Sequence, residues 1–219
     1  MKRILSMAVS VVAAASATAQ TLNIEVGNVT YAVPAVQAGN IDCQNGSSIS
    51  VMGRSLSTAD ITRMYVDDTN VADNTVSVVY SGTESKVTVA GNIMQYVEPT
   101  VSGAHVSISQ SEAVGDATCG EITYVLSGSS ADGAFAMDGS YKATIELCGL
   151  ALTNPSGAAL DIQNGKRIEL SVKKDTENTL ADGASGSQKG CIVCKGHLEL
   201  KGKGTLAVYG NAAHGIYAK

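Results

Sequence analysis

The sequence predicts an all-β protein whose second half is a solenoid of stacked coils. The 219-residue chain contains 23 Gly, three Pro and no Trp. Alternation of apolar and polar residues recurs along most of the chain, whereas apolar residues at a period of 3.6 are scarce, which favours strands over helices. From about residue 122 the sequence repeats itself at intervals of 24 to 32 residues, the spacing of stacked structural repeats.

The first nineteen residues have the pattern of a secretory signal peptide. Lys2 and Arg3 precede an apolar run over residues 4–15, and Ala17-Thr18-Ala19 forms a small-residue cleavage site. The run is shorter than the ~20 residues that span a bilayer, and no second long apolar run follows. We therefore expect residues 1–19 to be removed, and the mature protein, without a membrane span, to be secreted or to lie at the cell surface or in the periplasm.

Residues 20–115 are predicted to form a small β-rich N-terminal region. Short strands are expected over residues 21–33, 49–66, 74–90 and 104–109. The stretch TVSVVYSGTESKVTVAG (75–91) holds two alternating runs around SGTES, which predicts a hairpin. Residues 57–68 also permit a brief helical turn beginning at Ser57 or Thr58.

Residues 116–219 carry two repeated elements. Ile/Leu-Glu-Leu recurs at 145–147, 168–170 and 198–200, and a second short strand recurs at 158–162, 191–194 and 215–218. An insertion rich in turn residues, 175–190, lengthens one repeat. Each coil of such a stack buries its face only against its neighbours. Because the last repeat reaches Lys219 just as a coil begins, we expect the stack to continue beyond this residue.

Cys191 and Cys194 form a C-x-x-C pair that predicts a strand rather than a metal or redox centre. Aligned repeats place Leu160, Ile192 and Ile216 in one inward column, and Cys194 in the next. Side chains three apart on a strand point to opposite faces, so Cys191 is expected to point outward. A zinc site needs four ligands, and a thioredoxin-like motif needs a strand followed by a helix.

The charge distribution argues against nucleic-acid binding. Residues 20–165 hold four basic and fifteen acidic side chains, whereas residues 166–219 hold nine basic and five acidic ones. Nucleic-acid binding requires a concentrated basic face, usually with aromatic side chains. The basic last part could still contact an acidic polymer, and solvated strand faces are the simpler alternative. The sequence does not specify an oligomeric state.

The second half also resembles a known family. The segments ITYVLSGSSADGAFAMDGSYKATIELCGLALTNPSGAALDIQNGKRIELSVKKDTENTLADG (122–183) and KGHLELKGKGTLAVYGNAAHGIYAK (195–219) are similar to secreted bacterial carbohydrate-binding domain-containing proteins. The corner NTLADG, the strand pair GKGTLAVYG and the coil start HGIYAK carry the resemblance. It implies a right-handed parallel β-helix of the pectate-lyase type that binds plant or acidic polysaccharides without cleaving them, with calcium as a candidate cofactor.

Three functions compete: a non-catalytic carbohydrate-binding module, a polysaccharide lyase or hydrolase on a β-helix, and a structural or adhesive surface protein. Calcium-dependent lyases on β-helices resemble one another in using an Arg as the catalytic base. The mature chain contains only Arg54, Arg63 and Arg167, and none of them lies in an Arg-x-Pro-x-x-Arg motif. Glycoside hydrolysis needs two carboxyl groups held ~5–9.5 Å apart, and the adjacent pair Asp67-Asp68 fits a turn better. We therefore expect a binding protein and no catalytic residues.

The candidate polysaccharide ligands lie on the outward face of the repeated strands. If the apolar residues of Ile/Leu-Glu-Leu point inward, the glutamates share one outward position, with lysines further along the same strands for uronate groups, and exposed tyrosines offer aromatic faces to sugar rings. The candidates are Glu146, Glu169, Glu199, Lys173, Lys201, Lys203, Tyr209 and Tyr217. A glutamate row merely neutralised by lysines and solvent is the alternative.

The corner insertion supplies candidate calcium ligands. Calcium binds carboxylate, carbonyl and amide oxygens, and the segment KKDTENTLADG offers four such side chains, namely Asp175, Glu177, Asn178 and Asp182. Turn chemistry is the alternative, because Asn and Asp side chains also cap their own backbone.

Overall fold

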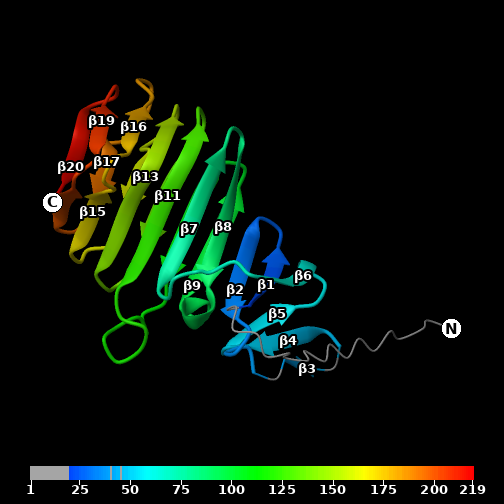
Figure 1. Ribbon diagram of the computed structural model, residues 1–219. Coiled ribbons are helices and arrows are strands. Elements are labelled where there is room, and N and C mark those ends of the chain that lie inside the picture. Colours follow the sequence, from blue (N-terminus) through cyan, green and yellow to red (C-terminus); the bar gives the residue numbers. More distant parts are fainter. Residues whose placement is uncertain (1–19, 40, 45) are drawn as a thin grey trace.

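The computed structural model describes residues 20–39, 41–44 and 46–219, and its regular structure is almost entirely β-strand (Figure 1). The all-β prediction is confirmed. The predicted signal peptide, residues 1–19, lies outside the described residues. Within the described ranges, no helix is long and apolar enough to cross a membrane; the 3-10 turn η1 spans Gly91–Ile93.

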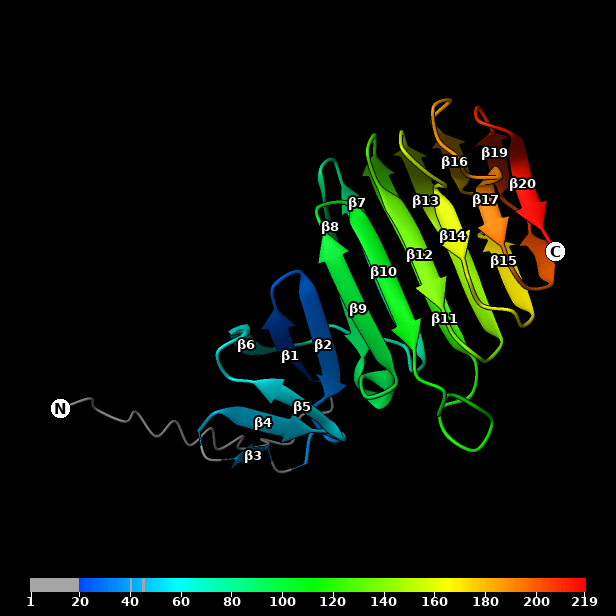
Figure 2. The same ribbon diagram turned by 180° about the vertical axis from the view of Figure 1, so that it is seen from behind.

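Two large sheets and one small sheet contain all the strands. The eleven-stranded sheet consists of β1 (Thr21–Val26), β2 (Val29–Pro34), β6 (Ile61–Asp67), β7 (Thr75–Ser81), β8 (Glu84–Ala90), β11 (Ile122–Ser130), β13 (Ala143–Asn154), β15 (Ile168–Val172), β16 (Glu177–Asp182), β18 (Leu198–Gly202) and β19 (Thr205–Tyr209). The six-stranded sheet, in front in Figure 2, consists of β9 (Val97–Ser102), β10 (His105–Gln110), β12 (Ala134–Asp138), β14 (Leu160–Ile162), β17 (Gly190–Cys194) and β20 (His214–Ala218). The small sheet consists of β3 (Asp42–Gln44), β4 (Ser48–Val51) and β5 (Arg54–Ser57).

The first half of the chain is built from antiparallel hairpins. β7 and β8 pair antiparallel, with Val78 opposite Val87, so the hairpin predicted at 75–91 is confirmed. β1 pairs antiparallel with β2, and β9 with β10. Gly82 and Gly27 have φ of 67° and 59° and lie in the short turns of two of these hairpins, where a side chain would be strained.

The second half is built from parallel strands in register. In the large sheet β7, β11, β13, β15 and β18 follow one another, and in the six-stranded sheet β10, β12, β14, β17 and β20 do so. Leu160 lies opposite Ile192, and Ile192 lies opposite Ile216. The predicted inward column of these three residues is therefore confirmed.

The right-handed parallel β-helix predicted for residues 116–219 is nevertheless wrong. The observed architecture consists of mixed multi-stranded sheets, and a single hydrogen-bonded layer holds both the hairpins and the parallel strands, joined by the parallel pair β2–β8. A connection as short as the one between β7 and β8 permits only antiparallel pairing, because a parallel pair needs a long crossover. The repeats describe local pairing in the second half and do not determine the architecture of the whole chain.

Two further structural observations bear on the predicted organisation. Both large sheets continue across residue 115, the predicted boundary, through the pairs β7–β11 and β10–β12. The helical turn predicted within 57–68 is found only as a short turn over residues 58–60, where the Asp60 N–H donates to the Ser57 carbonyl oxygen at 3.1 Å, and β6 occupies Ile61–Asp67 and pairs with β1. Pairing with β1 supplies hydrogen-bond partners that a single exposed helical turn would lack, so tertiary context overrides the local preference.

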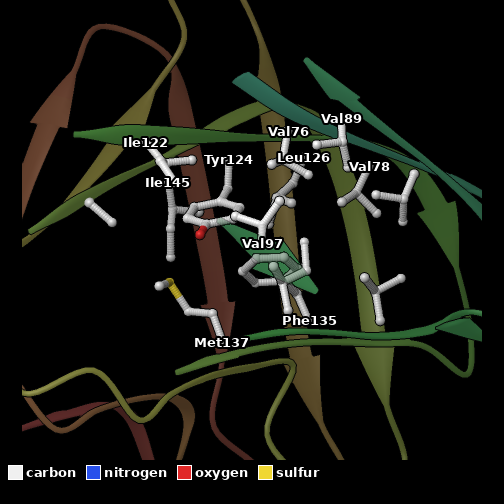
Figure 3. Close-up of a cluster of buried hydrophobic side chains, with 14 of the residues drawn as sticks. Val76, Val78, Val89, Val97, Ile122, Tyr124, Leu126, Phe135, Met137 and Ile145 are labelled. Carbon is white, nitrogen blue, oxygen red and sulfur yellow. The ribbon is translucent and has the colours of Figure 1, made fainter. Parts of the chain in front are cut away.

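The core lies between the two large sheets. Alternate side chains of β7, β11 and β13 point inward and meet Phe135 and Met137 of β12 (Figure 3). The rings of Tyr124 and Phe135 lie 5.8 Å apart, and both side chains are fully buried. Burying each such large side chain contributes roughly 1.5–3 kcal/mol. The Tyr80 hydroxyl also donates to the carbonyl oxygen of Ala134 at 3.0 Å, which links the two layers directly.

Candidate functional site

The outward side of β11, β13, β15 and β18 carries a dense array of charged side chains, here called the charged face. Its rows follow the parallel register: Thr123, Thr144, Glu169 and Glu199 form one row, and Val125, Glu146, Ser171 and Lys201 form the next. Neighbours in a row are separated by the strand spacing of ~4.8 Å. The inward side of the first three strands is apolar and buried, so folding of the core fixes which residues this face presents.

The register differs from the one that the Ile/Leu-Glu-Leu repeat predicts. Glu169 and Glu199 share one outward row, as expected, but Thr144 takes the third place in it. Glu146 lies two residues further along β13, opposite Ser171. Since a shift of two residues keeps every side chain on its face, the hydrophobic pattern cannot distinguish the two registers.

Arg167 is the central cation of the charged face. Its Nη2 lies 2.8 Å from Oε2 of Glu121, and its Nη1 lies 3.5 Å from an oxygen of both Glu169 and Glu199. Burial opposes the charged guanidinium, yet Glu121 and Glu199 together raise the pKa of Arg167. The hydroxyl of Thr144 donates to the other oxygen of Glu121 at 2.8 Å. A basic side chain held by three carboxylates stays charged and keeps a fixed position.

Lys201 forms the second link of the same network. Its Nζ lies 2.7 Å from Oε2 of Glu169 and 3.2 Å from Oε2 of Glu199. The hydrogen bonds that Lys201 donates to Glu169 and Glu199 raise the pKa of Lys201, and the one to Glu199 lowers the pKa of that carboxylate. His197 adds a contact of 3.7 Å to the other oxygen of Glu199. Glu199 is thus held ionised by the cations beside it.

Lys173 and Glu146 make a separate pair at the end of the charged face. Lys173 Nζ lies 3.6 Å from Glu146 Oε1, and the Lys173 side chain is 53 % exposed. The neighbouring Cys148 and Glu146 together raise the pKa of Lys173. Lys203, one strand further, is exposed and has no ion-pair partner among the described residues. Lys173 and Lys203 directly follow β15 and β18 and are both exposed.

The two candidate tyrosines lie away from the charged face. Tyr209 ends β19 and is 56 % exposed. Tyr217 lies on β20 in the other large sheet, in the outward row of Asp161 and Val193, as expected. Its ring stacks on His214 at 6.2 Å, and Lys189 Nζ lies 5.0 Å from its centroid. The structure therefore does not bring these rings together with the glutamates.

The four candidate calcium ligands are not gathered into one site. Asp175 has a φ of 60° and, like Glu177, is exposed. Asn178 is buried, and its Oδ1 accepts hydrogen bonds from the N–H groups of Gly149 and Leu150 at 3.0 and 2.8 Å. The described residues contain no group of three His, Cys, Asp or Glu that could hold a metal ion.

Asp182 is also buried, and its carboxylate accepts hydrogen bonds from two other segments of the chain. Its Oδ2 accepts a hydrogen bond from Gln188 Nε2 at 2.9 Å, and its Oδ1 accepts one from the Asn211 N–H group. The backbone N–H groups whose hydrogen bonds Asn178 and Asp182 accept lie 28 or 29 residues away in the sequence, so these side chains join neighbouring segments rather than capping their own backbone as the alternative interpretation proposed. Calcium binding itself stays a prediction of the sequence.

The C-x-x-C pair lies on β17, as predicted. Cys194 is buried, in register between Ile162 and Ala218, and its core position is confirmed. Cys191 is fully buried as well, although it was expected to point outward. Burial and the nearby Asp182 raise the pKa of Cys191 to about 12. The corner insertion was not foreseen to cover this side of the strand.

Sequence reasoning missed three members of the network: Arg167, Glu121 and His197. Each directly precedes a strand of the charged face, β15, β11 and β18 respectively. A signal was present, because Arg167 stands two residues before Glu169 and His197 two residues before Glu199, so alternation places them on the same side. Glu121 had no such signal, since only the pairing of β11 with β13 brings it to this face.

The charged face offers both kinds of group that a sugar polymer requires. Carboxylates accept hydrogen bonds from hydroxyl groups, and ammonium and guanidinium groups donate to hydroxyl and carboxylate oxygens. The face follows a sheet, so its groups extend over four strands rather than converging on one point. Such an arrangement can hold an extended, hydroxylated or acidic chain at several positions.

Comparison with known proteins agrees with this chemistry. The family model of the carbohydrate-binding domain-containing proteins matches residues 102–219. A solved structure, the polysaccharide lyase-like protein from C. thermocellum in a gadolinium derivative, is similar with a TM-score of 0.50 and 20% sequence identity. The similarity covers 63% of this chain and 53% of that one, so the chain spans about half of its length. This level of identity indicates a shared fold only. No curated protein matches the chain.

Proposed function

Because the chain belongs to the family of carbohydrate-binding domain-containing proteins, we propose that it binds polysaccharide on the charged face without cleaving it, and that it prefers acidic polysaccharides. The observation that carries this proposal is the position of Lys173 and Lys203. Both residues are exposed and directly follow β15 and β18, whose carboxylates Glu169 and Glu199 are already contacted by Arg167 and Lys201. Lys203, which has no ion-pair partner among the described residues, and Lys173, whose pair with Glu146 is open to solvent, bind uronate groups in this proposal, while the glutamates accept sugar hydroxyls.

We also propose that the protein is exported, on the basis of the signal-peptide pattern of residues 1–19, and that calcium is its candidate cofactor. A chelator arm in the binding experiment tests the calcium proposal. If calcium contributes, removal of the ion should weaken binding of the acidic polymer, and added calcium should restore it.

The binding proposal is tested with a double variant, Lys173→Ala/Lys203→Ala. Titration calorimetry with polygalacturonate and with a neutral galactan should show about tenfold weaker binding of the acidic polymer, since two exposed charge contacts are lost. Neutral-polymer affinity should change less. The difference should grow at low salt, because screening of exposed charges is then weaker.

A matched control removes two lysines elsewhere. Lys195 and Lys219 are exposed and follow β17 and β20 of the other sheet, so Lys195→Ala/Lys219→Ala makes the same change in net charge and should leave both affinities unaltered. Equal losses in the two double variants would contradict binding at the charged face. New reducing ends or unsaturated products released from either polymer would contradict a non-catalytic role. Binding of neither polymer would favour a structural or adhesive protein.

A further inference from the structure

A pocket in the N-terminal half lies outside the residues that the family model matches. It is formed where the β1–β2 hairpin, β5 and β9 meet, and its volume is about 380 Å³. Pockets that bind small ligands measure roughly 300–1,000 Å³ and combine apolar walls with a few well-placed polar groups. This pocket has both features, and it contains none of the residues of the charged face.

Arg54 fixes one wall of the pocket. The Arg54 side chain is only 15 % exposed, and its Nη1 donates to the carbonyl oxygens of Met94 and Val97 at 2.8 and 3.0 Å. Its Nη2 lies 2.6 Å from Oε2 of Glu98, and the guanidinium lies 4.7 Å above the ring centroid of Tyr31. Both terminal nitrogens are therefore engaged and hold Glu98 in place, while the buried Nε of Arg54 has no hydrogen-bond partner among the described residues.

Two carboxylates supply free hydrogen-bond acceptors in the pocket. Glu98 is 66 % exposed, and its Oε1 accepts no hydrogen bond from a described residue. The exposed carboxylate of Asp60 likewise has no partner within the described part of the chain. The hydroxyls of Ser55 and Ser57 also line the pocket. A suitable ligand must therefore present donors, such as hydroxyl groups.

The charge of the pocket argues against an anionic ligand. Two carboxylates, Asp60 and Glu98, face one cation, Arg54, that is already paired. A third carboxylate placed beside them would meet uncompensated negative charge, which is unfavourable. The remaining lining includes Val29, Leu56 and Pro99, which offer apolar contact to a ligand whose faces carry C–H groups.

We propose that this pocket binds a single neutral sugar unit, whose hydroxyl groups donate to Glu98 and Asp60, and that it rejects uronic acids. The choice of a sugar among hydroxylated ligands rests on the carbohydrate-binding function proposed above. The selectivity is opposite to that of the charged face, which takes acidic sugars. The chain would thus contact two different kinds of sugar unit at two separate places.

The test uses matched monosaccharide pairs and the full mature chain. Galactose with galacturonic acid, glucose with glucuronic acid, and mannose with mannuronic acid differ within each pair only at C6. Amide signals of residues 26–31 and 54–60 are followed by NMR during titration at pH 7. The neutral member of at least one pair should shift these signals, and its uronic acid should bind at least about tenfold more weakly.

Variants assign the effect to the pocket. The Asp60 carboxylate has no partner among the described residues, so Asp60→Asn breaks no internal contact. This variant should weaken neutral-sugar binding and reduce the ratio between the affinities for the neutral sugar and for its uronic acid. Glu98→Gln should do the same. Asp68→Asn removes an equal charge from an exposed residue outside the pocket. It should change neither the affinity for the neutral sugar nor the preference over the uronic acid.

Each outcome bears on one site only. Three results would overturn the pocket proposal. They are the absence of any shift with every sugar tested, equal binding of the uronic acids and their neutral partners, and identical behaviour of Asp60→Asn and Asp68→Asn. If pocket shifts persist while the chain binds no polysaccharide, the charged-face proposal fails and the pocket stands. The variant Lys173→Ala/Lys203→Ala should leave the pocket signals unchanged.

Discussion

Glu199 is held by three basic side chains of the charged face. Lys201, Arg167 and His197 lie within 3.2, 3.5 and 3.7 Å of its carboxylate oxygens. Hydrogen bonding from Lys201 is the main cause of the lowered pKa of Glu199. A carboxylate whose pKa is lowered by folding stabilises the fold above the ordinary glutamate pKa of about 4.3, and this contribution is lost as the pH falls through the lowered value.

Replacing Lys201 should therefore have a pH-dependent effect. In Lys201→Met we expect the pKa of Glu199 to rise toward its ordinary value, as measured by NMR titration of the side-chain carboxyl carbon. The variant should be less stable than the parent at pH 7, and the difference should shrink below about pH 4, where the carboxylates become protonated. Lys195→Met serves as the control. A stability difference of the same size at pH 3 and pH 7 would argue against the ion pairs as its source.

Four free cysteines, Cys119, Cys148, Cys191 and Cys194, differ in accessibility. Cys119 and Cys148 are partly exposed, whereas Cys191 and Cys194 are buried, and burial raises the pKa of both buried thiols. Since the thiolate is the reactive form, iodoacetamide should modify Cys119 and Cys148 first in the native protein. Peptide mass spectrometry after timed alkylation measures the order, and fast modification of Cys194 would contradict its core position.

The same strand can be tested by substitution. Cys194→Ala should lower the free energy of unfolding by about 1 kcal/mol, the typical cost of losing a small buried group, without changing the metal content of the purified protein. Stoichiometric zinc that disappears in this variant would contradict the strand interpretation.

At the scale of elements, the corner before β16 depends on Asn178. Its Oδ1 accepts two backbone N–H groups, and its Nδ2 donates to the carbonyl oxygen of Thr205 at 3.2 Å, so one buried side chain joins β13, β16 and β19. Asn178→Ala should cost about 2 kcal/mol, because buried backbone groups lose their partners. The neighbouring exposed Glu177→Ala should stay within about 0.5 kcal/mol.

Urea denaturation with and without calcium separates the two interpretations of this corner. If the Asn178 side chain only makes the hydrogen bonds described above, Asn178→Ala lowers the free energy of unfolding by the same amount with and without calcium. A loss that appears only when calcium is present would instead support the ion site.

The sequence was most informative where pairing is local. The hairpin around Gly82 and the inward column of Leu160, Ile192 and Ile216 were predictable, because turn residues and a repeat specify them directly. The position of Glu146 in the register was not predictable, since a shift of two residues leaves the hydrophobic pattern unchanged. Glu121 joins Arg167 only through strand pairing, which no motif in the chain encodes.

At the scale of the whole molecule, the class of architecture was the hardest prediction. Repeats indicated parallel stacking in the second half, and the structure contains it. They contained no information on how the N-terminal hairpins join the same sheet through β2–β8. That joining depends on which strand edges remain open after the local hairpins form, a property of the assembled chain rather than of any segment.

The last strands of the two large sheets have inward positions that are only partly covered. Leu200 of β18 is 55 % exposed and Ile216 of β20 is 38 % exposed, whereas Leu170 of β15 and Ile192 of β17 are fully buried. Each step from β18 toward β11 therefore adds apolar contact. Local opening requires least free energy where few apolar contacts are broken.

The consequence is a gradient of amide hydrogen exchange along the sheets. In a protein consisting of residues 20–219, amides of β18, β19 and β20 should exchange fastest, those of β15 and β17 more slowly, and those of β11 and β13 slowest, approaching the rate set by global unfolding. Hydrogen exchange with mass spectrometry, read on peptides from each strand, measures the order. Equal protection of β18 and β11 would mean that the sheet opens as one cooperative unit. Under the gradient, Glu199 and Lys201 lie on the strand that opens first, so in this protein the charged face loses and regains its outermost strand, β18, without the core unfolding.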